Sequence, residues 1–140
     1  MSAKIIDGKA IAADLRQHLE KEVRILSNKG IRPGLAVVLV GENPASMSYV
    51  TAKERDCEKV GIYSRDIRLP ADTSQEALLK LISDLNSDEK IHGILVQLPL
   101  PEGLDEEEVI RHIDPAKDAD GFHPESIGRL VLNLDGFLPC

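Results

Sequence analysis

The chain has 140 residues, of which 42% are hydrophobic, 29% charged and only 3% aromatic, and its net charge at pH 7 is −7. This length and composition fit one globular domain with its own core. The acidic balance, with no cluster of Lys and Arg, argues against nucleic acid as a partner. Apolar runs of about eight residues are too short to span a membrane, for which about 20 are needed.

Cysteine usage and the N-terminal sequence indicate the compartment. Cys57 and Cys140 form neither a disulfide framework nor a metal-binding motif, so no metal is expected. The N-terminus lacks the apolar core of a signal peptide and carries acidic residues early. We therefore expect a cytoplasmic protein.

Helical and strand patterns alternate along the chain. Apolar spacing and end signals predict helices over residues 8–30, 43–61, 73–88 and 105–113. Short aliphatic runs predict buried strands over 32–41 and 91–101, and a more polar edge strand over 62–70. The weaker segments 3–7 and 129–136 are expected as peripheral strands. This order predicts an α/β fold, a mostly parallel open sheet with helices on both faces in three layers.

The predicted helix 43–61 carries a lysine on its inward face. At about 100° per residue, Ser46, Tyr49, Val50, Cys57 and Val60 share an arc of roughly 100°, and Lys53 lies near its middle. A lysine there can extend its amine to water along an apolar surface. Alternatively, partial burial disfavours the charged amine, so that it can exchange protons near neutral pH. The pattern alone leaves both interpretations open.

Gln97 is the second unusual residue, because it is the only polar side chain in the run "GILVQLPLP". Pro99 limits further strand pairing, which places Gln97 at the carboxyl end of the strand. Ligand crevices of open α/β sheets form at such ends. A ligand contact and a structural hydrogen bond to a neighbouring loop both fit this position.

The segment 114–126, "DPAKDADGFHPES", concentrates three aspartates, Asp114, Asp118 and Asp120. A calcium-binding EF-hand loop is excluded, because with Gly121 at its sixth position the first and twelfth would be Ala116 and Ile127. For a single carboxylate next to a glycine, a turn is the simpler interpretation. His123 lacks metal-ligand spacing and is expected to be structural or exposed.

Three motifs follow one another in a recognisable order: "NPASMSYVTAK", "GILVQLPLP" and "KDADGFHPESIGRL". Together with "AKIIDGKAIA" and "GLAVVLVGENPAS", they resemble the bifunctional methylenetetrahydrofolate dehydrogenase/cyclohydrolase family over essentially the whole chain. Ala119 stands where the family usually has valine. The resemblance implies that residues 1–140 are the N-terminal folate-binding catalytic domain, and that the C-terminal NAD(P)-binding Rossmann domain is absent from this chain.

The resemblance also implies roles for the unusual residues. Lys53 matches the catalytic lysine, Gln97 the glutamine that hydrogen-bonds it, and Tyr49 the aromatic residue that packs on the folate ring and helps catalysis. Asp120 matches the carboxylate that anchors the pterin ring. Further positions that match the family's substrate pocket are Pro99, Leu100 and Ser46.

The implied function is one-carbon folate interconversion, from 5,10-methylene- through 5,10-methenyl- to 10-formyltetrahydrofolate. NADP or NAD would serve the full-length enzyme, whereas no cofactor is expected on this fragment, which should lack dehydrogenase activity. A homodimer is expected for the full-length protein, and a monomer is compatible with the fragment. Two alternatives are a folate-binding module without turnover and a flavodoxin-like regulatory domain that uses an aspartate of residues 114–120.

Overall fold

The computed structural model describes residues 5–139, and its longer helices begin where the sequence supplies a polar cap. The side chains of Asp7, Asn43, Ser74 and Asp105 each accept hydrogen bonds from backbone N–H groups of the first helical turn. The second helix ends at Gly61, whose φ of 86° is the left-handed conformation that favours glycine. The helices are α1 (Gly8–Asn28), α2 (Pro44–Val60), α3 (Gln75–Ser87), α4 (Glu106–His112) and α5 (Pro124–Val131), with a 3-10 turn η1 (Pro115–Lys117).

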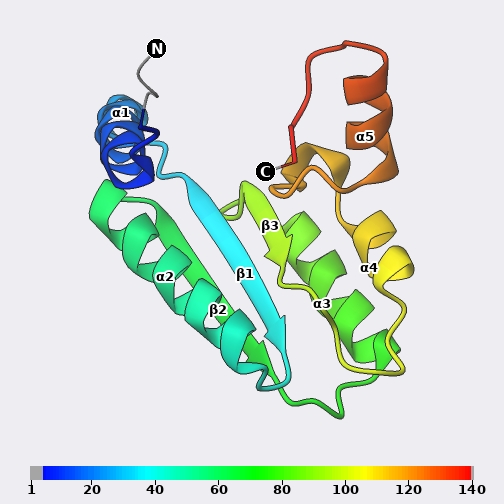
Figure 1. Ribbon diagram of the computed structural model, residues 1–140. Helices are drawn as coiled ribbons and strands as arrows, with labels where there is room; N and C mark the ends of the chain where they lie inside the picture. Colours follow the sequence, from blue (N-terminus) through cyan, green and yellow to red (C-terminus); the bar gives the residue numbers. More distant parts are fainter. Residues whose placement is uncertain (1–4, 140) are drawn as a thin grey trace.

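Three parallel strands form the sheet: β1 (Gly34–Val40), β2 (Tyr63–Leu69) and β3 (Gly93–Val96). Their order is β2-β1-β3, so the most aliphatic strand is central and the more polar β2 lies at an edge. The α/β class, the parallel sheet and the edge position of residues 62–70 are therefore confirmed. Figure 1 shows helices on both sides of this sheet, as the three-layer prediction requires.

Several predicted boundaries were wrong. The strand expected over 91–101 is only four residues long, because Gln97 donates one last backbone hydrogen bond to the Val38 carbonyl and the chain then turns away. Residues 129–136 form no strand: they complete α5 and continue into a turn at Asn133. Of the segment 3–7, residues 3 and 4 lie outside the described part, and Asp7 caps α1.

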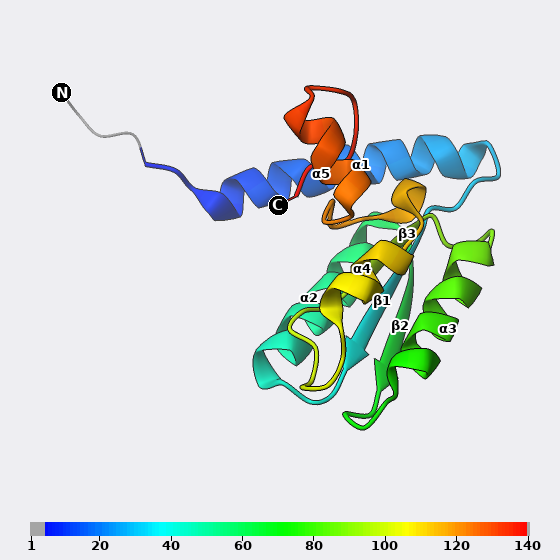
Figure 2. The same cartoon turned by 90° about the vertical axis from the view of Figure 1, so that its right-hand side faces the viewer.

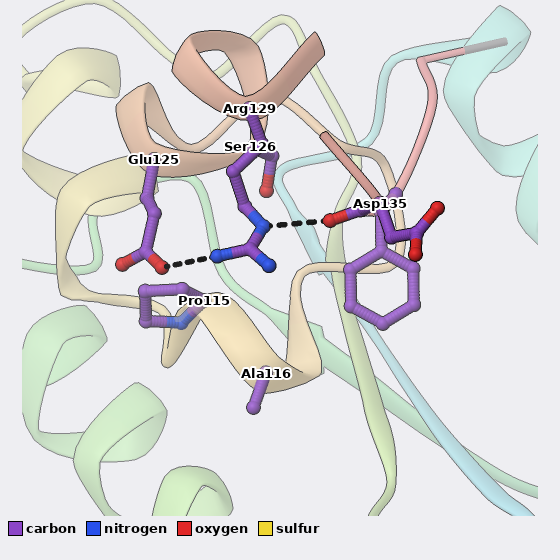
Figure 3. A pocket seen from close by; sticks show the side chains of 8 residues that line it. Pro115, Ala116, Glu125, Ser126, Arg129 and Asp135 are labelled. Carbon is purple, nitrogen blue, oxygen red and sulfur yellow. Dashed lines mark hydrogen bonds and ion pairs between the residues drawn. The ribbon is translucent and has the colours of Figure 1, made fainter. Parts of the chain in front are cut away.

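The C-terminal elements η1 and α5 were not predicted, and they enclose a hollow of about 380 Å³. Arg129 of α5 crosses this hollow, with its Nε 2.7 Å from the Asp135 carbonyl oxygen and its guanidinium 3.7 Å from the Glu125 carboxylate (Figure 3). Because its charge is already matched there, Arg129 gives the hollow no free cation.

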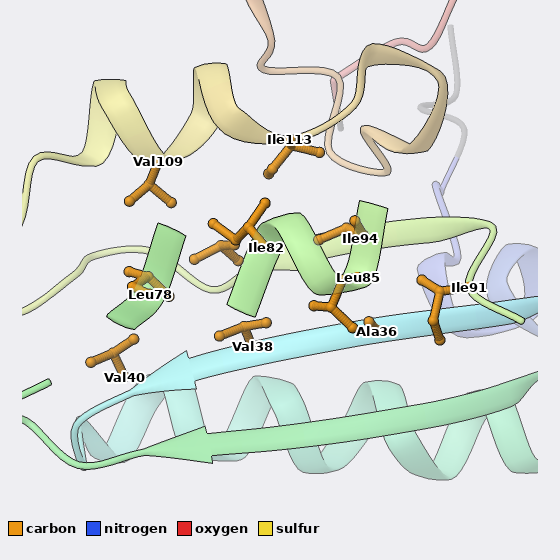
Figure 4. Close-up of a cluster of buried hydrophobic side chains, with 11 residues drawn as sticks. Ala36, Val38, Val40, Leu78, Ile82, Leu85, Ile91, Ile94, Val109 and Ile113 are labelled. Atoms are coloured by element: carbon orange, nitrogen blue, oxygen red, sulfur yellow. The ribbon is translucent and has the colours of Figure 1, made fainter. Parts of the chain in front are cut away.

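The larger core lies between one face of the sheet and helices α3 and α4. Alternate residues of β1 and β3 point to this face, where they meet the apolar stripe of α3 (Figure 4). Its buried members are Ala36, Val38, Val40, Leu78, Ile82, Leu85, Ile91, Ile94, Val96, Val109 and Ile113. The other face carries a smaller cluster, in which Val50 of α2 packs against the sheet residues Val37, Leu39 and Leu95.

Helix α1 packs beside α2 rather than on the sheet, and its first turns extend past the rest of the molecule (Figure 2). An ion pair from Arg16 to Asp56, 3.0 Å apart, ties the two helices. Of the apolar stripe expected to face the core, only Val23 is buried, whereas Ile11, Leu15 and Leu19 are 49%, 59% and 45% exposed. Within residues 5–139, no helix is long and apolar enough to cross a membrane.

Candidate active site

Helix α2 places Lys53 at the border between core and solvent. Ser46, Val50, Cys57 and Val60 of the predicted arc are buried, so this side of α2 does face the sheet. Lys53 lies among them and is half-buried. Part of the lysine side chain is therefore covered, and its amine has a specific partner.

That partner is Gln97, directly after β3. The Lys53 Nζ donates to the Gln97 Oε1 at 2.9 Å, and the Gln97 Nε2 donates to the Leu98 carbonyl at 2.9 Å. The second bond fixes the amide, because a flipped side chain would turn its NH₂ group toward the lysine and leave the carbonyl oxygen of Leu98 without that donor. Gln97 thus presents an acceptor to Lys53, and a lysine amine keeps N–H donors for it before and after losing a proton.

Asp120 supplies the negative charge of the site. Burial raises the pKa of Asp120. The positive charge of Lys53 lowers this pKa in part, and the negative charge of the nearby Asp118 carboxylate raises it further. No hydrogen bond from residues 5–139 stabilises the charged form of Asp120. A half-buried carboxylate of this kind is suited to a ligand that brings its own N–H donors.

Asp118 behaves differently, because its side chain is fully enclosed and hydrogen-bonded. It accepts from the backbone N–H groups of Gly121 and His123 and from the Ser126 hydroxyl. Both aspartates lie in the same polar run, and nothing in the run itself indicates that Asp118 is enclosed while Asp120 is half-buried. Its burial also makes Asp118 unsuitable as the exposed aspartate that a flavodoxin-like regulatory domain would use.

The remaining predicted residues surround this group less closely. Tyr49 lies one turn before Lys53 and is 63% exposed, so it is not part of the core side of α2. Ser46 is buried one turn further toward the start of α2, and Pro99 is exposed. Leu100 packs against the core cluster between the sheet and α3, which gives it a structural contact in addition to any role in a pocket.

Two residues complete the chemistry of this region. Glu106, which the sequence did not single out, accepts a 2.7 Å hydrogen bond from the Leu100 backbone N–H and so holds the segment after Gln97. Cys57 lies one turn beyond Lys53, and burial, with the Asp56 charge, raises the pKa of its thiol. A buried thiol of this kind is a poor nucleophile, so Cys57 is not a candidate for the reactive group of α2.

Residues 6–120, which contain Lys53, Gln97 and Asp120, match the sequence profile of the tetrahydrofolate dehydrogenase/cyclohydrolase family, catalytic domain. The chain belongs to this family. A curated relative, the bifunctional protein FolD of Geotalea uraniireducens, is 60% identical over 138 residues. That alignment covers 99% of this chain but 49% of the relative, so the chain spans about half the length of the curated relatives it matches.

Solved structures of the tetrahydrofolate dehydrogenase/cyclohydrolase family have the same fold. The bifunctional enzyme FolD from Campylobacter jejuni superposes with a TM-score of 0.94 at 47% identity, covering 96% of this chain and 48% of that protein. The enzyme from Trypanosoma brucei, solved with NADP cofactor and an inhibitor, gives a TM-score of 0.94 at 36% identity and covers 100% and 49%, respectively.

The turn after β1 lacks the features of a dinucleotide phosphate site. Family members such as the Trypanosoma brucei enzyme bind NADP, and phosphates of such cofactors usually sit on a glycine-rich turn between a strand and a helix. After β1 that turn is Gly41-Glu42-Asn43-Pro44, in which the Asn43 side chain occupies the first N–H groups of α2. The first N–H groups of α2 are therefore not free to hold a cofactor phosphate at this turn.

Proposed function

We propose that this chain is the folate-binding catalytic half of a bifunctional methylenetetrahydrofolate dehydrogenase/methenyltetrahydrofolate cyclohydrolase. The observation that carries the proposal is the Lys53–Gln97 hydrogen bond, with Asp120 near enough for its charge to interact with that of Lys53, inside the segment that matches the family profile. In the longer protein a second, NAD(P)-binding Rossmann domain would complete the cleft. The homodimer and the cytoplasmic location remain predictions.

The hydrolytic step needs a group that moves protons without opposing the substrate's charge. Water adds to the cationic methenyl carbon, a C–O bond forms, and the water gives up a proton. One ring C–N bond then breaks and its electrons stay on nitrogen, while the hydroxyl of the adduct loses its proton as the formyl C=O forms. A proton added to that nitrogen completes 10-formyltetrahydrofolate, so that one proton is released overall. Lys53 would move these protons, and Gln97 holds its amine by an acceptor that carries no charge. A carboxylate at residue 97 would instead hold the ammonium and oppose proton release.

Substrate binding falls to the residues around this pair. The Asp120 carboxylate, which accepts no hydrogen bond from residues 5–139, would accept hydrogen bonds from the amino group and ring N–H of the pterin. Tyr49, exposed one turn before Lys53, would pack its ring on the folate ring system. Ser46, Pro99 and Leu100 remain predicted pocket positions. Hydride transfer would need NADP or NAD bound by the second domain.

A folate-binding module without turnover is the second candidate, because the chain spans about half the length of its relatives. The two are separated by titrating the 140-residue chain with a folate analogue in a calorimeter and by following hydrolysis of methenyltetrahydrofolate. We compare Lys53→Ala with Lys59→Ala, a matched change on the solvent side of α2.

Binding with hydrolysis that falls in Lys53→Ala but not in Lys59→Ala supports the enzyme. If the chain binds the folate analogue but hydrolyses methenyltetrahydrofolate no faster than background, and neither variant changes this result, the chain is a folate-binding module. Absence of folate binding refutes the proposed function.

A further inference from the structure

Two carboxylates in one short loop have opposite environments. Asp118 is 1% exposed and accepts three hydrogen bonds. Asp120, two residues later, is half-buried and receives none from residues 5–139. We propose that Asp118 is a positioning residue that holds Asp120 in place for the substrate, an inference that rests on the proposed function.

The three hydrogen bonds that Asp118 accepts fix the chain on the C-terminal side of Asp120. The Asp118 Oδ1 accepts from the Gly121 N–H at 3.0 Å, and the Oδ2 accepts from the His123 N–H at 2.9 Å and the Ser126 Oγ at 2.7 Å. The first bond closes a turn over Asp118–Gly121, and the other two join this turn to the start of α5. Asp120 is therefore at the tip of a turn whose closing acceptor is Asp118.

The N-terminal side of Asp120 is fixed by the sheet. Asp118 pairs with Ile94 of β3 in a single parallel bridge, and the Ala119 N–H donates to the Ile94 carbonyl at 3.2 Å. One residue earlier, the Lys117 Nζ donates to three carbonyl oxygens at the end of α3, those of Leu85, Asn86 and Asp88. The turn thus has a rigid base, and the Asp118 carboxylate decides how its tip is oriented.

Gly121 shows how tightly the turn is closed. Its φ is +70°, and a Cβ added there would lie 2.9 Å from the Pro139 backbone nitrogen and 3.0 Å from the Leu138 carbonyl carbon. No ordinary side chain fits at this position, so the N–H of residue 121 can point at Asp118 only because the residue is glycine. If the bonds to Asp118 are weakened, the chain between Ala119 and His123 gains freedom, and Asp120 loses its fixed direction.

The difference from a merely structural role can be measured. A structural residue changes the unfolding temperature but not the affinity of the folded protein. A positioning residue changes the affinity, and only while Asp120 is present to be positioned. Ser126→Ala is the gentler test, because it removes one bond to Asp118 and leaves both backbone donors, whereas Asp118→Asn removes acceptor capacity directly.

The matched control is Ser83→Ala, which also removes a serine hydroxyl bonded to another side chain, here the His112 Nε2 at 2.8 Å. We measure the dissociation constant for the folate analogue in the 140-residue chain, well below each variant's unfolding temperature. Ser126→Ala should weaken binding about three- to tenfold and Asp118→Asn more, whereas Ser83→Ala should leave it unchanged. In an Asp120→Ala background, Ser126→Ala should have no further effect.

Unchanged affinity in Ser126→Ala, or an equal loss in the Asp120→Ala background, overturns the positioning role. If Asp118→Asn does not fold, Ser126→Ala decides alone. Failure of the unsubstituted chain to bind folate would refute the proposed function itself. Binding that Asp120→Ala weakens but Ser126→Ala does not would refute only the role of Asp118.

Discussion

Replacing Asp120 with asparagine should stabilise the free protein and weaken its binding of folate. Burial raises the pKa of Asp120 above its ordinary value of 3.8, so between these two pKa values the folded state binds more protons than the unfolded state. Stability is therefore lost as the pH rises through this window and stays lower above it. Asparagine does not titrate and so escapes this loss. The unfolding temperature of Asp120→Asn minus that of the unsubstituted chain should therefore be more positive at pH 7 than below pH 3.8, and at pH 7 the variant should unfold at the higher temperature.

The cost in binding follows from the same environment. Since no protein group in residues 5–139 donates to Asp120, the substitution breaks no hydrogen bond in the free protein and removes only the charge interactions with Lys53 and Asp118. In the complex it replaces a charged acceptor by a neutral amide, one of whose groups is itself a donor. Leaving buried donors of the ligand poorly matched costs about 1–3 kcal/mol, which corresponds to a roughly 5- to 160-fold rise in the dissociation constant.

Thermal unfolding between pH 3 and pH 8, followed by circular dichroism, and calorimetry with the folate analogue at pH 7 would test both parts. Asp56→Asn is the control with the opposite sign. The hydrogen bond and charge of Arg16 lower the pKa of Asp56, so its contribution to stability is present at pH 7 and is lost as the pH falls through the folded pKa. Asp56→Asn should therefore unfold at a lower temperature at pH 7. An Asp120→Asn variant that is less stable than the unsubstituted chain at pH 7, or that binds folate equally well, would refute the reasoning.

Three further substitutions test other parts of the molecule. Lys53→Met in the full-length protein should lower the rate of methenyl hydrolysis by about 10²–10⁴-fold, the usual contribution of a general acid–base, with little change in folate affinity; a fully active variant would remove Lys53 from the mechanism. Gln97→Glu should also slow hydrolysis while the fold is kept, because a carboxylate holds the lysine as its ammonium; hydrolysis at the unsubstituted rate would count against the need for a neutral acceptor. Ile82→Ala, in the fully buried stripe of α3, should lower the free energy of unfolding by about 2–5 kcal/mol in urea titrations, and a loss below about 1 kcal/mol would mean that the core closes around the missing atoms.

Much of the fold could be predicted because local signals agree with the sheet. The aliphatic run that became β1 is buried on both faces, which is why it showed no alternation, and α2 carries its cap, its first-turn proline and its final glycine in the sequence. The strand predicted over 129–136 was wrong for a physical reason. Their alternating apolar residues resemble a strand, but Pro124 and the His123 cap start a helix that runs to Val131.

The site was predicted in part. The position of Lys53 on the helix and the break in the apolar run at Gln97 were visible, and the structure brings these two side chains together. The helical arc also included Tyr49, which lies at the edge of that arc and remains exposed. The family resemblance singled out Asp120, but the enclosed environment of Asp118 could not be predicted, because it depends on which carboxylate meets the donors of α5.

The Lys53–Gln97 contact joins residues that are 44 positions apart in the chain. Between them lie the edge strand and the whole of α3, so the two side chains can meet only after β3 has paired with β1 and α2 has docked on the opposite face. No local segment can hold this pair early in folding. Proton transfer by Lys53 would therefore begin only once these long-range contacts have formed, and its onset during refolding would report the assembly of the sheet with α2 rather than the appearance of helices.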